Sequence, residues 1–171
     1  VSGIDLGDGT TDPGTWQAAG MQLLIDTIRN AGASQPILLD GLQWASAFNG
    51  LLSHLPRDPL NQMAAVYHLY HGNGCDDQSC WRSNILQPAD RLPVIVSELG
   101  EKRGECSETF ITSFMQWADR QNLSYLVWTW NAGLPGDEEN WRCDQFGLIE
   151  SYDGTPTPYG RGLQQHLLSL N

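Results

Sequence analysis

The chain of 171 residues carries 20 acidic and 9 basic side chains, a formal net charge of −11, and it is 40% hydrophobic. That length and apolar content predict a folded domain with its own core and exclude a disordered tail. The charge argues against nucleic acid and anionic membrane surfaces as partners, because both repel an acidic protein. No apolar run approaches the roughly 18 residues that span a bilayer.

The first half of the chain predicts one helix and two buried strands. Asp12 followed by Pro13 is typical of a helix start, and apolar residues at helical spacing extend the predicted helix over 13–31. Short apolar runs predict a strand that begins near residue 36 and ends near Leu42, and a second strand over 63–71. The segment 80–91 is expected to hold at most a short helix.

In the second half of the chain, predicted strands alternate with predicted helices. Strands are predicted over 93–99 and 124–132, and between them aromatic residues at helical spacing predict a helix over 107–121 with Ser107 as its N-cap. Thr157 followed by a proline starts a last helix, whose apolar residues are Leu163, Leu167 and Leu170. Apolar strands that alternate with helices favour a parallel sheet, either open and doubly wound or part of a (β/α) barrel.

Polar and aromatic residues collect where the predicted strands end, and this favours the barrel, because barrel enzymes assemble their sites there. The residues are Gln43, Trp44, His68, Tyr70, Glu98, Trp128, Trp130 and Asn131. Glu98 stands out because it ends an apolar run, "LPVIVSELGE". No glycine-rich phosphate loop follows any strand, which weakens the dinucleotide-binding alternative. We expect no cofactor and no metal.

The four cysteines predict two disulfides, Cys75 to Cys80 and Cys106 to Cys143, in preference to a zinc site or free thiols. Disulfides form in oxidising compartments, so the chain is expected to be secreted. The triplet that starts at Asn122 fits a glycosylation sequon.

Five segments in this order, "HLY", "CDDQSCW", "PVIVSELGE", "FITSFMQWADRQNLSYLVWTWNAG" and "LIESYDGTPTPYG", resemble the C-terminal half of secreted cellulases of glycoside hydrolase family 5. The resemblance runs from about Thr15 to Leu170. It implies that residues 1–171 form a single (β/α)4 half-barrel domain with strands five to eight of a TIM (β/α)8 barrel. It also implies retaining hydrolysis of β-1,4-linked glucans or mannans.

By the same resemblance Glu98 is the nucleophile, His68 and Tyr70 stand near it, and Trp130 is a platform for a sugar ring. Trp44 and Trp128 are further candidates for sugar contact, because tryptophan is a flat stacking surface. The alternatives are that Glu98 is a solvated strand-end acid, that His68 is a hydrogen-bonded core residue and that the deeper of the two late tryptophans belongs to the core.

The sequence departs from the family pattern at the second catalytic carboxylate. The family carries it in an Asn-Glu-Pro motif at the end of strand four, but "GIDLGDG" stands in that place and no such motif occurs in the chain. Asp5 and Asp8 lie close to that place in the sequence and are weak candidates for a replacement. Glu101 is interpreted as a loop charge.

Four strands alone leave open sheet edges and an uncovered apolar layer. We therefore expect association, most simply a homodimer that completes the barrel, in which the partner's loop with Asp137, Glu138 and Glu139 could supply a proton donor. The resulting hypotheses are a β-1,4-glucanase that needs a second carboxylate, a non-catalytic glucan-binding half barrel, and a truncated or engineered barrel fragment.

Overall fold

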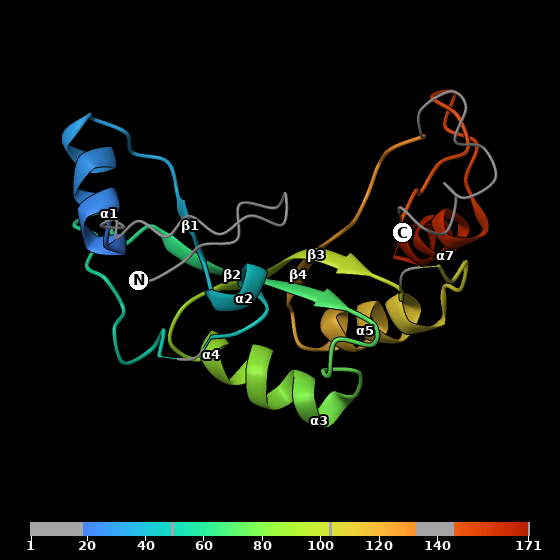
Figure 1. Cartoon of the computed structure of the whole chain (residues 1–171), viewed down its shortest axis with the longest axis horizontal. Helices are drawn as coiled ribbons and strands as arrows, with labels where there is room; N and C mark the ends of the chain where they lie inside the picture. Colours follow the sequence, from blue (N-terminus) through green and yellow to red (C-terminus); the bar gives the residue numbers. More distant parts are fainter. Residues whose placement is uncertain (1–18, 49, 103, 133–145, 171) are drawn as a thin grey trace, which may run out of the picture. The chain divides into compact units, whose positions relative to one another are not determined.

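The computed structural model describes residues 19–48, 50–102, 104–132 and 146–170 (Figure 1). They fall into two compact units, which are described separately. The first comprises the described residues up to Ile37 together with Leu55–Gln62, and the second comprises Leu38–His54 and the described residues from Met63 onwards.

The first unit contains helix α1, Met21–Asn30, which ends before Gly32 in the left-handed conformation (φ +84°). The predicted helix over 13–31 is too long at its start, because Gly20 is the N-cap and the helix begins at Met21; residues 12 and 13 lie outside the described residues. Ile25 is the buried residue of α1, whereas Leu23 and Leu24 are exposed.

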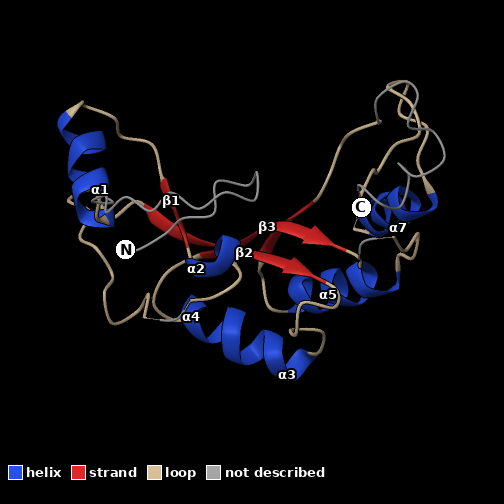
Figure 2. Ribbon diagram, in the orientation of Figure 1, coloured by secondary structure: helices blue, strands red, loops and turns tan. Residues whose placement is uncertain are grey.

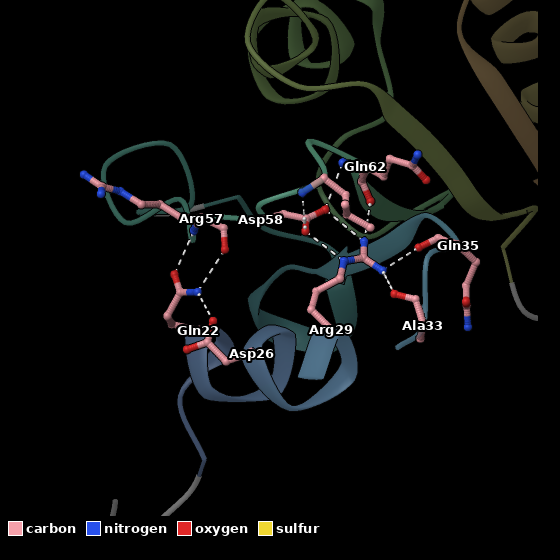
Figure 3. A network of polar contacts seen from close by, with 9 residues as sticks. Gln22, Asp26, Arg29, Ala33, Gln35, Arg57, Asp58 and Gln62 are labelled. Carbon is pink, nitrogen blue, oxygen red and sulfur yellow. Dashed lines mark hydrogen bonds and ion pairs between the residues drawn. The ribbon is translucent and has the colours of Figure 1, made fainter. Parts of the chain in front are cut away.

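A network of polar contacts ties α1 to the segment Leu55–Gln62 within this unit (Figure 3). The Arg29 guanidinium donates from Nε and Nη2 to the two carboxylate oxygens of Asp58, at 2.8 and 2.9 Å. Asp58 also accepts the backbone N–H groups of Leu60 and Gln62. The hydrogen bond from Arg29, together with these backbone donors, holds the pKa of Asp58 well below its usual range.

Replacing Asp58 by Asn should lower the free energy of unfolding at neutral pH, because the guanidinium then loses its carboxylate. The folded-state pKa lies below the ordinary value of 3.8, so this stabilisation is present above that value. It is lost as the pH falls through the folded-state pKa. Urea unfolding of both proteins at neutral pH and in acid measures the difference, which should shrink in acid.

Asp26→Asn is the matched control, because Asp26 is an exposed residue of the same helix whose carboxylate accepts a hydrogen bond from the Gln22 amide. A change in unfolding free energy as large as that of Asp58→Asn would contradict the account.

The second unit is built on a sheet whose strands are β1 (Ile37–Asp40), β2 (Met63–Tyr70), β3 (Val94–Gly100) and β4 (Ser124–Val127), in that spatial order (Figure 2). Pairing is parallel between β2 and β3 and between β3 and β4. The prediction of a half TIM barrel with four parallel strands and covering helices is confirmed. Its correspondence to strands five to eight stays a prediction.

Two strands are shorter than predicted. β1 ends at Asp40, and the chain enters a short helical turn, α2 (Leu42–Ala45), in which Gln43, Trp44 and Ala45 have φ of 55°, 52° and 59°. β4 ends at Val127 instead of residue 132. Trp44, Trp128 and Trp130 therefore belong to segments that follow strands.

The helices of the second unit include one that is longer than the short helix expected within residues 80–91. Residues 78–89 are helical throughout, as α3 (Gln78–Trp81), the π-helical segment η1 (Arg82–Leu86) and α4 (Gln87–Ala89). α5 spans Thr109–Arg120, two residues shorter at its start than predicted, and α7 spans Pro158–Ser169. The side chain of Thr157 caps α7, as the sequence predicts.

The core of this unit lies between the sheet and the helices α3, α4 and α5. Figure 1 shows these helices together on one side of β2 and β3. Trp81 of α3 contacts Phe114 and Trp117 of α5, and all three rings are buried. α7 instead buries Tyr159 and His166 and leaves Leu167 and Leu170 exposed.

The disulfide between Cys75 and Cys80 confirms the first predicted bridge. Cys106 is also disulfide-bonded, and Cys143, its predicted partner, lies outside the described residues. No helix in the described ranges is long and apolar enough to cross a membrane.

Candidate active site

Glu98 owes its position to an irregularity in β3. Tyr67 of β2 pairs with Val96, but the next residue, His68, pairs with Glu98, so β3 contains one extra residue at Ser97. Such a bulge bends a strand and changes the face to which the following side chains point. Val96 is fully buried, whereas the Glu98 side chain is 26% exposed. The bulge thus turns the carboxylate out of the core.

Two side chains of β2 hold one oxygen of this carboxylate. The Tyr70 hydroxyl donates to Glu98 Oε2 at 2.7 Å, and His68 Nδ1 lies 3.5 Å from the same oxygen. Burial, and then the hydrogen bond to Glu98, raise the pKa of Tyr70, so the hydroxyl stays protonated and remains a donor. Within the described residues Glu98 Oε1 accepts no hydrogen bond and is available to a ligand.

The Tyr70 ring can take this place only because residue 100 is glycine. A Cβ atom at Gly100 would lie 2.5 Å from two ring carbons of Tyr70. The ring also contacts Phe146, with the centroids 5.1 Å apart. The ring is therefore packed against the end of β3 and an aromatic neighbour, and these contacts fix the hydroxyl that orients Glu98.

Glu98 opens into a pocket of about 380 Å³. Its lining residues come from α2, β2 and β3 and from the segments that follow them: Gln43, Trp44, Ser46, His68, Tyr70, Asn73 and Glu98. The pocket therefore brings together four of the six predicted site residues, and its other lining residues add two amide groups and one hydroxyl group. A carboxylate, hydrogen-bonding side chains and an aromatic ring together suit a polyhydroxylated ligand.

Trp44 lies at this pocket with 92% of its surface exposed. Its backbone is left-handed, as are those of Gln43 and Ala45, and non-glycine residues adopt this conformation at a cost. An exposed indole on a strained turn does not contribute to the core. It offers a flat apolar face to a ligand instead.

Trp128 and Trp130, the remaining predicted site residues, follow β4 and do not line the Glu98 pocket. The Trp128 backbone N–H donates to the carbonyl of Leu99, which places Trp128 beside the end of β3. The side chains are 44% and 66% exposed. Because β4 ends at Val127, strand alternation does not determine the faces on which these two rings lie.

Glu101 is a buried residue and not the loop charge that the sequence suggested. Its Oε1 accepts the backbone N–H groups of Phe110 and Ile111 at 2.7 and 3.1 Å, so it caps the first turn of α5. Burial raises the pKa of this carboxyl group, although the two backbone donors act in the opposite direction. Ser107, the predicted cap, accepts the N–H of Thr109.

The family to which the chain belongs follows from a comparison with models of protein families. The family model for cellulase, glycosyl hydrolase family 5, matches residues 8–133, well over half of the chain. The chain belongs to glycosyl hydrolase family 5. Comparison with curated protein sequences gives no significant match.

Solved structures related to this family 5 chain share its fold. A beta-glucanase from Saccharophagus degradans, in complex with cellotetraose, superposes with a TM-score of 0.65 at 20% identity over 87% of this chain and 46% of that one. An endo-beta-1,4-glucanase from Xanthomonas axonopodis pv. citri gives 0.62 at 21% identity, over 85% and 52%. A beta-mannanase from Streptomyces thermolilacinus, solved with mannohexaose, gives 0.64 at 18% identity, over 84% and 46%. The chain thus spans about half the length of these structures.

Among its described lining residues the Glu98 pocket of this family 5 chain contains a single carboxyl group, that of Glu98. Asp5 and Asp8, and the acidic loop 137–139, lie outside the described residues. No group of three His, Cys, Asp or Glu side chains in the described part of the chain could hold a metal ion. The described residues of the pocket therefore supply one carboxylate for any reaction there.

Proposed function

We propose that this family 5 chain binds β-1,4-glucan at the Glu98 pocket and that Glu98 is the nucleophile of a retaining hydrolysis. The observation that carries the proposal is the carboxylate itself, oriented through one oxygen by Tyr70 and His68 in a pocket with an exposed tryptophan. Ser46, Gln43 and Asn73 offer hydrogen bonds to sugar hydroxyls, and Trp44 stacks on the apolar face of a pyranose.

In the proposed reaction the unoccupied oxygen of Glu98, Oε1, attacks the anomeric carbon and forms a glycosyl ester. The glycosidic C–O bond breaks, and the leaving oxygen takes a proton from a second carboxyl group. Water, deprotonated by that same group, then hydrolyses the ester with overall retention. Tyr70 and His68 keep the attacking carboxylate in one orientation throughout, and such positioning contributes a large share of the rate in enzymes.

The second carboxyl group has to lie about 5 to 5.5 Å from the first in a retaining enzyme. We propose that another chain supplies it, most simply a second copy that completes the barrel. The edge strands β1 and β4 support association, because Leu38 and Leu126 are 51% and 61% exposed. Asp5, Asp8 and the loop with Asp137, Glu138 and Glu139 are the candidate donors.

A second candidate function is glucan binding without hydrolysis. The single carboxyl group of the described pocket favours it, because loss of the proton donor removes about two to four orders of magnitude of rate. In that case the aromatic and polar residues around Glu98 would act as a binding surface only.

One experiment separates these functions. Binding of cellohexaose is measured by calorimetry, and release of reducing ends from β-1,4-glucan is followed over a range of chain concentrations. Binding with a specific activity that rises with concentration supports hydrolysis by an associated form. Binding without turnover supports the second function. Binding of mannohexaose but not of cellohexaose would show that the ligand is a mannan and not a glucan. Absence of binding to both would contradict the proposal.

We also propose that the chain works outside the cytosol. The Cys75–Cys80 disulfide and the disulfide-bonded Cys106 support this, because such bonds are rare in reducing compartments. Unfolding at a lower urea concentration after reduction with dithiothreitol would agree with structural disulfides of this kind.

A further inference from the structure

A second pocket, of about 450 Å³, adjoins the Glu98 pocket. It is lined by Tyr70, His71, Gly72, Asn73, Glu101, Lys102 and Phe146. Tyr70 and Asn73 line both pockets, so the two pockets are neighbours. None of the predicted site residues other than Tyr70 belongs to it.

Two buried polar atoms lie at this pocket without a hydrogen-bond partner among the described residues, Glu101 Oε2 and His71 Nδ1. They are 3.5 Å apart, and the Glu101 side chain is only 2% exposed. Leaving both atoms unsatisfied is costly, and a proton on Nδ1 directed at the carboxylate satisfies both at once. Glu101 cannot turn away, because its other oxygen is engaged by the start of α5.

This arrangement fixes the His71 ring. The ring stacks on Phe110 with centroids 5.0 Å apart and an angle of 12° between the planes. Its Nδ1 is buried, yet the side chain as a whole is 37% exposed. The exposed part is therefore the rest of the ring, where Nε2 is the polar atom. A carboxylate that holds one nitrogen of an imidazole orients the other nitrogen towards a ligand.

The charged groups at this pocket have neighbours of opposite or complementary character. Lys102 Nζ lies 3.3 Å from Glu105, and His71 Nδ1 lies 3.5 Å from Glu101 and 3.9 Å from Glu105. These polar groups can form hydrogen bonds, and the rings of Tyr70 and Phe146 add apolar surface. A hydroxyl-rich ligand fits both properties.

We infer that the second pocket is an additional glucan subsite, in which His71 Nε2, oriented by Glu101, hydrogen-bonds a hydroxyl group of the sugar unit next to the one at Glu98. The inference rests on the proposed function, since it requires that a glucan chain occupies the Glu98 pocket. His71 acts in binding here and takes no part in bond cleavage.

The test is an NMR titration of the full chain, labelled with ¹⁵N, by cellohexaose. The tryptophan indole signals report occupation of the Glu98 pocket, and the ring nitrogens of His71, assigned by comparison with His71→Gln, report the second pocket. We expect both sets to shift with one binding curve. Calorimetry should show that His71→Ala weakens cellohexaose binding by about tenfold. His54→Ala, a change of an exposed histidine that lines neither pocket, should leave it unchanged.

Tryptophan shifts without any change at His71, and an unaltered affinity of His71→Ala, would overturn the inference and leave the proposed function standing. Absence of tryptophan shifts and of any measurable binding would overturn both. The titration of the unsubstituted chain decides the matter even if His71→Ala does not fold.

Discussion

Glu98→Gln should lower the rate of cleavage of dinitrophenyl β-cellobioside by about 10³-fold or more, because it removes the attacking carboxylate and nearly preserves its shape. This substrate is chosen because dinitrophenolate leaves without a proton. The first step then needs Glu98 and no second carboxyl group, so the assay reports the nucleophile even if the proton donor belongs to another chain. Release of the coloured phenolate measures the rate.

Two further variants make this prediction specific. Glu98→Ala should regain activity in azide and yield the α-glycosyl azide, because the small anion attacks from the vacated side of the sugar. Glu150→Gln changes an acidic residue outside the Glu98 pocket and should cleave the substrate at the normal rate. Equal rates for Glu98→Gln and the unsubstituted chain would show that Glu98 is not the nucleophile.

Tyr70→Phe should lower kcat for the same substrate by about 10- to 100-fold. The change removes the 2.7 Å hydrogen bond to Glu98 Oε2, and a hydrogen bond to a charged group contributes about 1.5–3 kcal/mol. Among the described residues, His68 at 3.5 Å is then the polar neighbour that the carboxylate keeps. A small displacement of an attacking group reduces the rate strongly, whereas the glucan contacts of the other pocket residues remain. KM should therefore change less than kcat.

Tyr67→Phe is the matched control, because Tyr67 is a buried residue of the same strand that contacts Phe48 and does not line the Glu98 pocket. Its activity should stay close to that of the unsubstituted chain. A kcat for Tyr70→Phe that equals that of the control would contradict the role assigned to the hydroxyl.

The sheet could be predicted because its strands are buried and parallel. Runs such as residues 63–70 and 94–99 are almost wholly apolar, and short apolar runs between helical patterns are typical of such strands. The end of β4 could not be predicted, because it depends on a distant segment. The Thr129 N–H donates to the carbonyl of Phe146, and the Leu148 N–H donates to the carbonyl of Thr129.

The full length of the helix at residues 78–89 was not predicted, because its signals are mixed. Asp77 caps it, as a sequence pattern could have shown, since its side chain accepts the N–H groups of Ser79 and Cys80. Pro88 lies near the end of this continuous helix, directly after the π-helical segment η1, and a proline inside a helix is normally a signal against one.

Of the candidate site, the sequence indicated Glu98, His68, Tyr70 and Trp44, because all lie at or just after the carboxyl end of a strand. It did not indicate the bulge at Ser97, which nothing in an apolar run announces, or the role of Glu101. A helix cap is normally sought beside the first helical residue, but Glu101 reaches α5 from eight residues before Thr109. Only the folded loop brings the two together.

The most direct test of Glu98 as the nucleophile is covalent trapping of its glycosyl ester. The chain is incubated with dinitrophenyl 2-deoxy-2-fluoro-β-cellobioside, whose fluorine slows hydrolysis of the glycosyl ester, and is then analysed by mass spectrometry and peptide mapping. We expect the addition of one fluorocellobiosyl group per chain, located on Glu98. Addition at another carboxylate, or no addition while the unfluorinated substrate is cleaved, would contradict this role of Glu98.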